Sequence, residues 1–314
     1  MNKKALICGI SGQDGAYLAR LLLSYGYEVF GTSRNALSND FVRLERLKIK
    51  SQVKLVSMAL DDINSVLSVA SKIEPDEIYN LAGQTSVNLS FKYPVETMES
   101  ISAGVLNLLE FIRTSNKKIR LYNACSGECF GDTGTDPATE KTPFKPRSPY
   151  AVAKAASFWQ VEIYRQAYDV FACSGLLFNH ESPLRPEFFV TQKIINGVKE
   201  IAKGNLDKIA LGNLDISRDW GYAGDYVVPM WKMLQIDEPT DFIIATGETY
   251  SLEEFVHKSF DAYSLDWTKF VTVDKSFFRP LDIYMSKANP KKAKDILGWE
   301  AKHTLDDLIK IMMN

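Results

Sequence analysis

Short apolar runs alternate with amphipathic stretches along the first half of the chain. Five runs have the length of buried strands, at residues 4–9, 27–32, 53–58, 77–82 and 119–124. Between them, residues 16–25 and 101–114 repeat their apolar positions with the spacing of a helix. Strands that alternate with helices are typical of a doubly wound parallel sheet, so the pattern predicts an α/β fold of the Rossmann type.

The alternation becomes irregular after about residue 178. Helical patterns follow at residues 189–203, 252–262, 290–297 and 304–312, and strand-like pieces at 208–212 and 241–245. We expect a cofactor-binding Rossmann domain at 1–178, to which the chain returns around 213–245. Residues 179–212 and 246–314 would form a smaller C-terminal α/β lobe that binds substrate. Such a lobe would cover the carboxyl edge of the sheet, where open α/β folds bind their ligands.

Composition and charge restrict the class of protein. The 314 residues are 46% apolar and 24% charged, as in ordinary soluble globular proteins. A formal charge of -2 provides no basic field for nucleic acid or an anionic membrane. The chain lacks both a membrane-length apolar run and a secretory signal. We therefore expect a cytoplasmic protein with neither nucleic acid nor membrane as a partner.

Cysteine and histidine usage argues against a metal centre. The four cysteines, Cys8, Cys125, Cys129 and Cys173, lie in apolar surroundings and are expected to be reduced and buried. Cys125 and Cys129 have neither a second pair nor a histidine near them in sequence, as a zinc site would require. The three histidines are far apart in sequence, so we predict no metal and no Ser-His-Asp hydrolase.

A glycine-rich segment directly follows the first apolar run. Its pattern is G-x-x-G-x-x-G, and glycines allow a tight turn and a close backbone approach. A helix N-terminus placed there can receive a pyrophosphate, which predicts a dinucleotide site; the alternative is a purely structural turn. The residues expected to bind the cofactor are Gly9, Ser11, Gly12, Gln13, Asp14 and Gly15.

The end of the second strand bears on the choice of cofactor. An acidic residue there would bind the ribose diol of NAD, whereas an arginine can accept the 2′-phosphate of NADP. This chain has Arg34 and no acid at that point, so NADP is favoured. The alternative is that Arg34 is a solvated cation in a loop.

Tyr150 and Lys154 are four residues apart, which places both on one face of a helix. A nearby ammonium favours the ionised phenol and lowers its pKa from about 10. Tyr150 could then accept a proton from an alcohol that is being oxidised. Ser126, at the end of the fifth strand, is expected at the same edge, where its hydroxyl could hold the reacting oxygen. The alternative is an ordinary pair on a helix surface.

Glu128 adds a carboxylate that oxidation alone does not need. It stands two residues beyond Ser126, so it faces the same cavity if the segment stays extended. There it could remove the proton α to a new ketone and then protonate a leaving hydroxyl. The alternative is a loop carboxylate paired with a nearby cation.

FNHESP (178–183), within LFNHESPLR (177–185), and GNLD-x-x-RDWG (212–221) are the most specific segments of the chain. Other characteristic segments are GISGQDGAYL (9–18), YNLAGQTSV (79–87), SGE (126–128), TPFKPRSPYAVAK (142–154), FVTQKI (189–194), IATGETYSLEEF (244–255) and FFRP (277–280). Through these segments the chain resembles the GDP-mannose 4,6-dehydratase family, within the extended short-chain dehydrogenase/reductases.

The resemblance implies a redox-neutral dehydration of GDP-mannose, with NADP as the cofactor and Ser126, Glu128, Tyr150 and Lys154 as catalytic residues. It implies a homodimer or homotetramer. It also places Asp61, Leu81, Ala82 and Leu177 beside the cofactor, together with Tyr150 and Lys154. The residues that it assigns to the GDP-sugar are Gln84, Ser86, Asn179, Glu181, Lys193, Gly212, Asn213, Arg218, Arg279 and Asp282.

The chain departs from the family at a few positions. Arg34-Asn35 stands where many relatives have two arginines, which leaves both NADP preference and the tetramer open. Pro186-Glu187-Phe188 replaces small or polar residues beside the sugar, so a GDP-heptose 4,6-dehydratase remains an alternative. A 4-keto-sugar reductase or 4-epimerase has no use for Glu128, and a non-catalytic NADP-binding protein has none for the catalytic set.

Overall fold

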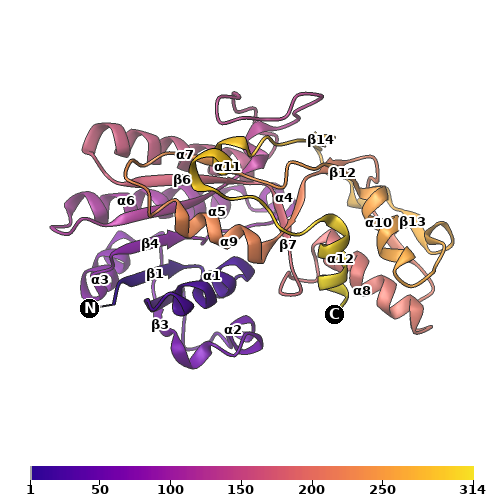
Figure 1. The fold of residues 1–314 in the computed structure, drawn as a ribbon, viewed down its shortest axis with the longest axis horizontal. Helices are drawn as coiled ribbons and strands as arrows, with labels where there is room; N and C mark the ends of the chain where they lie inside the picture. Colours follow the sequence, from indigo (N-terminus) through magenta and orange to yellow (C-terminus); the bar gives the residue numbers. More distant parts are fainter. Residues whose placement is uncertain (1) are drawn as a thin grey trace.

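A seven-stranded sheet forms the larger part of the computed structural model, which describes residues 2–314 (Figure 1). All neighbouring strands are parallel, in the order β11-β6-β5-β4-β1-β2-β3. This confirms the predicted Rossmann-type doubly wound sheet. The strands are β1 (Lys4–Cys8), β2 (Glu28–Ser33), β3 (Lys54–Ser57), β4 (Glu77–Asn80), β5 (Arg120–Ser126), β6 (Ala172–Leu177) and β11 (Phe242–Ile244).

Helices cover both faces of this sheet because its strands are apolar on both sides. In β1, Ala5 and Ile7 join a core with α1 (Gln13–Ser24), α2 (Val42–Arg46), α9 (Ala223–Lys232) and α11 (Lys291–Leu297). Leu6 and Cys8 point the other way, into a core with α3 (Ile63–Ile73), α6 (Gly104–Thr114) and α7 (Pro149–Tyr168). The alternation of side chains along a strand explains this division.

Short elements precede α6. They are α4 (Val87–Lys92), α5 (Pro94–Met98) and a π-helical turn, η2 (Glu99–Ala103). The helix predicted at 101–114 therefore becomes α-helical only at Gly104, and its first residues lie in the π turn.

A smaller lobe has its own apolar core, formed mainly by α8 (Val190–Ala202), α10 (Leu252–Asp261) and α12 (Leu305–Met313). Figure 1 shows it at the opposite end of the molecule from the N-terminus. Its short strands pair as β8 (Ile209–Leu211) with β13 (Val271–Val273), and as β9 (Ser217–Arg218) with both β12 (Tyr250–Ser251) and β14 (Met285–Ser286). Strands β7 (Asn179–Glu181) and β10 (Trp220–Tyr222) form a further parallel pair.

The chain crosses between the two parts more than once. Helix α9 packs against α1, and β11 forms one edge of the large sheet. Helix α11 contacts both α9 and β11, although it follows the segments of the smaller lobe in sequence. The domain boundaries expected from the sequence stay a prediction.

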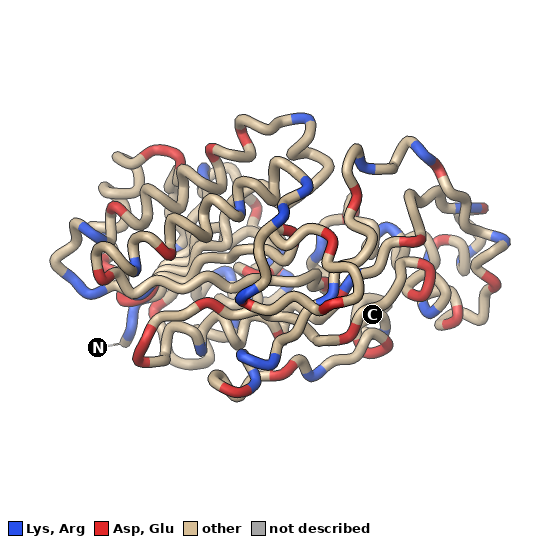
Figure 2. Tube along the Cα trace, turned by 90° about the horizontal axis from the view of Figure 1, so that it is seen from above, with Lys and Arg blue, Asp and Glu red and all other residues tan. Residues whose placement is uncertain are grey.

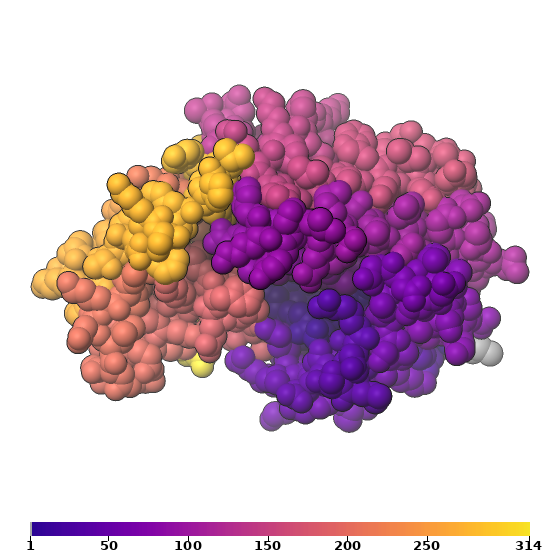
Figure 3. Space-filling view, turned by 180° about the vertical axis from the view of Figure 1, so that it is seen from behind, coloured from indigo at the N-terminus to yellow at the C-terminus, as the bar shows by residue number. Residues whose placement is uncertain are grey.

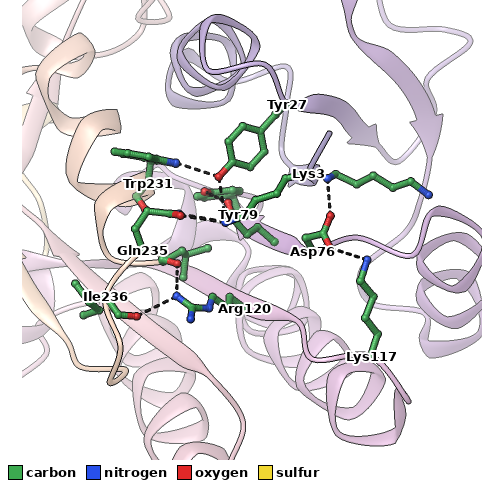
Figure 4. Close-up of polar contacts among 12 residues, drawn as sticks. Lys3, Tyr27, Asp76, Tyr79, Lys117, Arg120, Trp231, Gln235 and Ile236 are labelled. Atoms are coloured by element: carbon green, nitrogen blue, oxygen red, sulfur yellow. Dashed lines mark hydrogen bonds and ion pairs between the residues drawn. The ribbon is translucent and has the colours of Figure 1, made fainter. Parts of the chain in front are cut away.

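A cluster of polar side chains connects neighbouring strands at their amino ends through hydrogen bonds (Figure 4). At its centre the carboxylate of Glu77, which is 1% exposed, accepts hydrogen bonds from Lys3, Tyr27, Tyr79 and Gln235. Because α9 ends shortly before Gln235, the cluster ties that helix to β1 and β4 at the edge opposite the carboxyl ends of the strands.

Acidic and basic residues are interspersed along the trace in Figure 2. Between residues 2 and 314, no helix combines the length and the apolar character that crossing a membrane requires. The cytoplasmic location and the exclusion of membrane and nucleic-acid partners stay predictions.

Candidate active site

A cavity of about 310 Å³ opens at the carboxyl ends of the strands. Its walls come from the end of β5, from α7, from the segment that joins β6 to β7, and from the smaller lobe. Figure 3 shows the molecule hollowed between its N-terminal part, in indigo and violet, and the smaller lobe, in orange. This is the edge of an open α/β sheet where ligands bind.

The structure brings most of the predicted site residues to this cavity. Those that line it are Asp14, Leu81, Ser86, Ser126, Glu128, Tyr150, Lys154, Leu177, Asn179, Glu181, Lys193, Gly212, Asn213, Arg218, Arg279 and Asp282. The predicted residues outside its lining are Gly9, Ser11, Gly12, Gln13, Gly15, Arg34, Asp61, Ala82 and Gln84.

The glycines of the segment that joins β1 to α1 have different structural roles. Gly9 has φ +84°, and a Cβ on it would lie 2.8 Å from the carbonyl carbon of Leu81. A Cβ on Gly15 would lie 2.5 Å from the carbonyl oxygen of Gly9. Gly12 instead caps α1, and a Cβ there would meet only that same oxygen, at 3.4 Å. The open space at the N-terminus of α1 fits the pyrophosphate of a dinucleotide.

Arg34 and Asp61, both predicted to bind the cofactor, are exposed. Gln84 is occupied elsewhere, because its amide nitrogen donates to the carbonyl oxygen of Ser86 at 2.8 Å. Ser86 itself caps α4, where its hydroxyl accepts from the amide of Leu89. That Arg34, Asp61 and Gln84 contribute to ligand binding therefore stays a prediction.

Asp14 and His180 form a partly buried ion pair in the wall of the cavity. The Nε2 of His180 lies 2.9 Å from Oδ2 of Asp14, and its Nδ1 lies 2.8 Å from the carbonyl oxygen of Phe178. Burial opposes both charges, but His180 lowers the pKa of Asp14 and Asp14 raises the pKa of His180. An imidazolium has an N–H donor for each of these two oxygens, which agrees with the raised pKa of His180.

The predicted catalytic residues come together at the junction of β5 and α7. Ser126 ends β5, its hydroxyl accepts from the amide of Glu128 at 3.2 Å, and it lines the cavity together with Tyr150. Ser148 caps α7 by accepting from the amide of Ala151, so Tyr150 stands in the first turn. Lys154 follows one turn later on the same face.

Glu128 reaches the cavity by a different route from the one that the sequence suggested. The segment after Ser126 does not stay extended, because Gly127–Phe130 form a 3-10 turn, η3. A Cβ on Gly127 would lie 2.9 Å from the ring of Phe178, so this turn needs glycine to pack so closely. The turn carries the carboxylate of Glu128 into the cavity.

The expected lowering of the pKa of Tyr150 by Lys154 is wrong. Burial raises the pKa of Tyr150 above its ordinary value, and the nearby hydroxyl of Ser126 offsets only part of that rise. The ammonium of Lys154 donates to the carbonyl oxygen of Ala124 at 2.7 Å and lies 5.8 Å from the centre of the tyrosine ring. Burial also lowers the pKa of Lys154, an effect that the sequence pattern did not reveal.

Cations from the smaller lobe line the far side of the cavity. Arg218 is only 3% exposed, and its Nη2 has no hydrogen-bond partner among residues 2–314, although Asp282 lies 3.5 Å away. Arg279 lies 3.8 Å from Glu128, and Lys193 lies 4.0 Å from the ring centre of Phe277. Buried guanidinium groups of this kind need an anionic partner, so these side chains can bind a phosphate group.

Other cavity residues were missed from the sequence. Arg185 pairs with the buried carboxylate of Glu181 at 3.1 Å and covers the ring of Phe189. Arg185 ends the segment LFNHESPLR (177–185) that carried the resemblance, which was the available signal for it. Phe188 was expected beside the sugar, and it lines the cavity. The cavity is also lined by residues that were not predicted as site residues from the sequence, namely Thr85, Val87, Asn88, Phe189, Thr191, Trp220 and Phe277.

The four cysteines are buried and free, which confirms their predicted burial. Burial raises the pKa of Cys8 and of Cys173 to about 12. In the part of the chain that the structure describes, no cluster of three or more His, Cys, Asp or Glu side chains is arranged to hold a metal ion. The absence of a metal from the protein's function stays a prediction.

Comparison with known proteins adds a family and a set of relatives. Residues 6–312 match the family model described as GDP-mannose 4,6 dehydratase. A GDP-mannose 4,6 dehydratase of Arabidopsis thaliana is 44% identical over 322 residues, which cover 99% of this chain and 89% of that protein. One of Dictyostelium discoideum is 42% identical over 337 residues, covering 99% and 95%.

Solved structures share the fold. A Thermus thermophilus UDP-glucose 4-epimerase in complex with NAD superposes with a TM-score of 0.85, covering 99% of this chain and 97% of that one, at 24% sequence identity. At that identity the likeness establishes the fold.

Proposed function

The chain belongs to the GDP-mannose 4,6-dehydratase family, and we propose that its cavity converts GDP-D-mannose to GDP-4-keto-6-deoxy-D-mannose. The protein is accordingly a hydro-lyase. The observation that carries the proposal is the position of Glu128 beside Ser126 and Tyr150 in one cavity. A dehydrogenase, reductase or epimerase needs only the hydroxyl and the phenol, whereas an elimination also needs a group that removes a carbon-bound proton.

We propose NADP as the cofactor. The open space at Gly12 on the N-terminus of α1 supports a dinucleotide, and Arg34 without an acidic neighbour at the end of β2 supports the 2′-phosphate. When bound, the nicotinamide takes up a hydride from C4 of the sugar and returns it to C6, so the reaction is redox-neutral.

Tyr150 and Ser126 hold the 4-hydroxyl of the sugar in this scheme. Ser126 and Tyr150 line the cavity together, so the Ser126 hydroxyl can hold the sugar oxygen while Tyr150 accepts the hydroxyl proton as C4 is oxidised. Because burial raises the pKa of Tyr150, this transfer depends on positive charge close to the phenol. Lys154, one turn along α7 and fixed by its hydrogen bond to the Ala124 carbonyl, lies 5.8 Å from the centre of the Tyr150 ring and can supply this charge.

Glu128 carries out the elimination. The ketone at C4 acidifies the C5 proton, and the carboxylate takes that proton as the bond between C5 and C6 becomes double. The same group then gives the proton to the departing 6-hydroxyl, which leaves as water. Arg279, 3.8 Å away, stabilises the negative charge of Glu128 before the transfer. Tyr150 finally protonates C5.

The cations of the smaller lobe bind the diphosphate of the substrate. Arg218 has an unpaired nitrogen in a buried position, and Arg279 and Lys193 lie along the same wall. A guanidinium matches the geometry of phosphate oxygens and can bind them through two hydrogen bonds. Around them stand the other predicted substrate residues of the cavity, Ser86, Asn179, Glu181, Gly212, Asn213 and Asp282.

The test is incubation of the protein with GDP-mannose and NADP, with mass spectrometry for the loss of one water and detection of an alkali-absorbing keto sugar. We expect product without a net change in NADPH. Stoichiometric consumption of NADPH would instead identify a reductase. Water loss from a GDP-heptose but not from GDP-mannose would identify a heptose enzyme.

A variant separates the two chemical steps. Glu128→Gln keeps the shape of the side chain but cannot accept the C5 proton, so C4 oxidation should continue while water loss stops. Under single turnover this leaves NADPH on the protein, visible by its absorbance. Exposed Glu248 provides the matched control, because Glu248→Gln should dehydrate at the wild-type rate. Unimpaired dehydration by Glu128→Gln would contradict the role of Glu128.

We also propose that the protein is a homodimer. Large apolar side chains stay exposed on α4, α5 and α7, and α4 and α5 both pack against α7. They are Leu89, Tyr93, Val95, Met98, Val152, Trp159 and Ile163. Large apolar side chains that are gathered on neighbouring helices in this way are typical of a protein–protein interface. Sedimentation should give a dimer for the wild type and a monomer for Trp159→Glu; a monomeric wild type would contradict the proposal.

A further inference from the structure

Gln13 belongs to the glycine-rich segment, yet its side chain does not face the cavity. It is 5% exposed and absent from the cavity wall. Its amide nitrogen donates to the carbonyl oxygen of His180 at 3.0 Å, and its amide oxygen accepts from the hydroxyl of Ser182 at 2.8 Å. The side chain is therefore bonded at both ends to a segment that lies more than 160 residues later in the chain.

Ser182 is the counterpart of Gln13 in this contact. It is fully buried and also lies outside the cavity wall. Besides donating to Gln13, its hydroxyl accepts from the amide of Leu184 at 3.1 Å. Ser182 thus fixes both the turn that follows β7 and the attachment of that turn to Gln13.

Arg43 on α2 makes a second link between the same two segments. Its Nε donates to the carbonyl oxygen of Leu184 at 2.7 Å, and its Nη1 donates to the carbonyl oxygen of Ser11 at 2.9 Å. Because one planar guanidinium bonds to both segments, it fixes the distance between them.

The two segments serve different parts of the cavity. The first includes Gly12, where α1 begins, and the second carries His180, Glu181 and Arg185 into the cavity wall before α8 brings Lys193. A contact between them sets the position of the cofactor site relative to the sugar and phosphate site. This position matters, because hydride transfer requires the two reacting carbons to be about 3–3.5 Å apart.

We propose that Gln13, Ser182 and Arg43 are positioning residues that clasp the glycine-rich segment to residues 180–184, and that the Gln13 side chain makes no contact with the cofactor. The inference rests on cofactor binding at the glycine-rich segment, as proposed above. It changes the role expected for Gln13 from its motif. The backbone N–H groups in the first turn of α1 remain available for a pyrophosphate.

A double-mutant cycle tests the clasp by isothermal titration of NADP, without turnover. Gln13→Met keeps the length of the side chain and removes both of its hydrogen bonds, whereas Ser182→Ala removes one of them, the bond between the Ser182 hydroxyl and the Gln13 amide oxygen. Each should raise the Kd for NADP by about three- to tenfold, with the larger effect from Gln13→Met. The double variant should raise it by less than the product of the two single changes, because both changes remove the same bond between Gln13 and Ser182.

Ser259→Ala is the matched control. Ser259 is a fully buried serine of α10 whose hydroxyl donates to a backbone carbonyl, and it lies outside the cavity wall. The control should leave the Kd for NADP unchanged. In turnover assays with both ligands at saturation, the clasp variants should lower kcat, since the distance between the reacting carbons is no longer fixed, whereas Ser259→Ala should leave kcat unchanged.

The cycle also gives the results that would overturn the clasp. If Gln13→Met weakens NADP binding and Ser182→Ala does not, Gln13 contacts the cofactor directly. If the effects of the two changes multiply, the residues act independently. If Gln13→Met does not fold, Ser182→Ala and Arg43→Met test the clasp singly: each should raise the Kd for NADP relative to Ser259→Ala, and an unchanged Kd in both would overturn the clasp. A wild-type protein that fails to bind NADP would contradict the proposed cofactor, a result distinct from the others.

Discussion

Replacing Glu77 by leucine tests whether one buried carboxylate holds the amino ends of the strands together (Figure 4). Glu77 accepts from the hydroxyl of Tyr79 at 2.6 Å, from Tyr27 at 3.1 Å, from Gln235 at 3.1 Å and from Lys3 at 3.0 Å. Leucine fills a similar volume but accepts nothing, so each of these donors must find water or remain unpaired.

The donors differ in what they lose. The hydroxyl of Tyr79 belongs to a fully buried residue and cannot reach water, which costs about 1–3 kcal/mol. Tyr27 and Gln235 are partly exposed, so each loses about 0.5–1 kcal/mol. The side chain of Lys3 is 53% exposed and can turn to solvent, and such ion pairs contribute little. The free energy of unfolding should therefore fall by about 2–5 kcal/mol.

Urea unfolding followed by fluorescence and circular dichroism measures this difference. Glu45→Leu is the control, because Glu45 forms an exposed ion pair with Lys50 and its loss should cost below about 1 kcal/mol. A loss for Glu77→Leu no greater than for Glu45→Leu would refute the reasoning. Dehydration by the folded variant should stay at the wild-type rate, since the cluster lies at the opposite edge of the sheet from the cavity.

Gly15→Ala should lower the free energy of unfolding by about 1–3 kcal/mol, because the added Cβ would meet backbone atoms. Gly12→Ala should instead fold normally but bind NADP more weakly by titration. Equal unfolding midpoints of the two variants in urea would contradict this difference between the two glycines. The raised pKa of His180 adds stability that is complete below pH 6.5 and is lost as pH rises through the raised value. Unfolding free energies should therefore depend less on pH above 6.5 in His180→Gln, and identical slopes would count against the ion pair. A thiol reagent should label no cysteine in the native protein, including Cys8 and Cys173, but all four in urea.

The large sheet could be predicted because its central strands, such as β1, β4 and β6, are buried on both faces. A strand such as β1 then appears in the sequence as an uninterrupted apolar run, which stands out from its polar surroundings. The strands of the smaller lobe, such as β9 and β12, are only two residues long. No periodicity can be recognised over two residues, so their pairing depends on contacts between distant segments.

The candidate site was predictable where chemistry follows from position in the chain. Ser126, Tyr150 and Lys154 lie at the end of a recognisable strand and in the first turns of a helix, and the structure brings them together. The pKa of Tyr150 was predicted wrongly because burial, which raises it, is a property of the folded protein. The partnership of Arg185 with Glu181 likewise depends on the fold of one particular turn.

The contacts between FNHESP and the glycine-rich segment give a physical reason for the sequences of both. Gln13 and Asp14 of GISGQDG bond to His180 and Ser182 of FNHESP through two amide hydrogen bonds and one ion pair. Among residues 2–314, the polar groups of Gln13 and Asp14 that make these contacts have no other side-chain partners, and neither do those of His180 and Ser182. Leaving one of these groups unpaired in a buried position costs about 1–3 kcal/mol, so a change in either segment destabilises the other. The two segments therefore function as a single structural unit, which holds the cofactor end of the cavity against its substrate end.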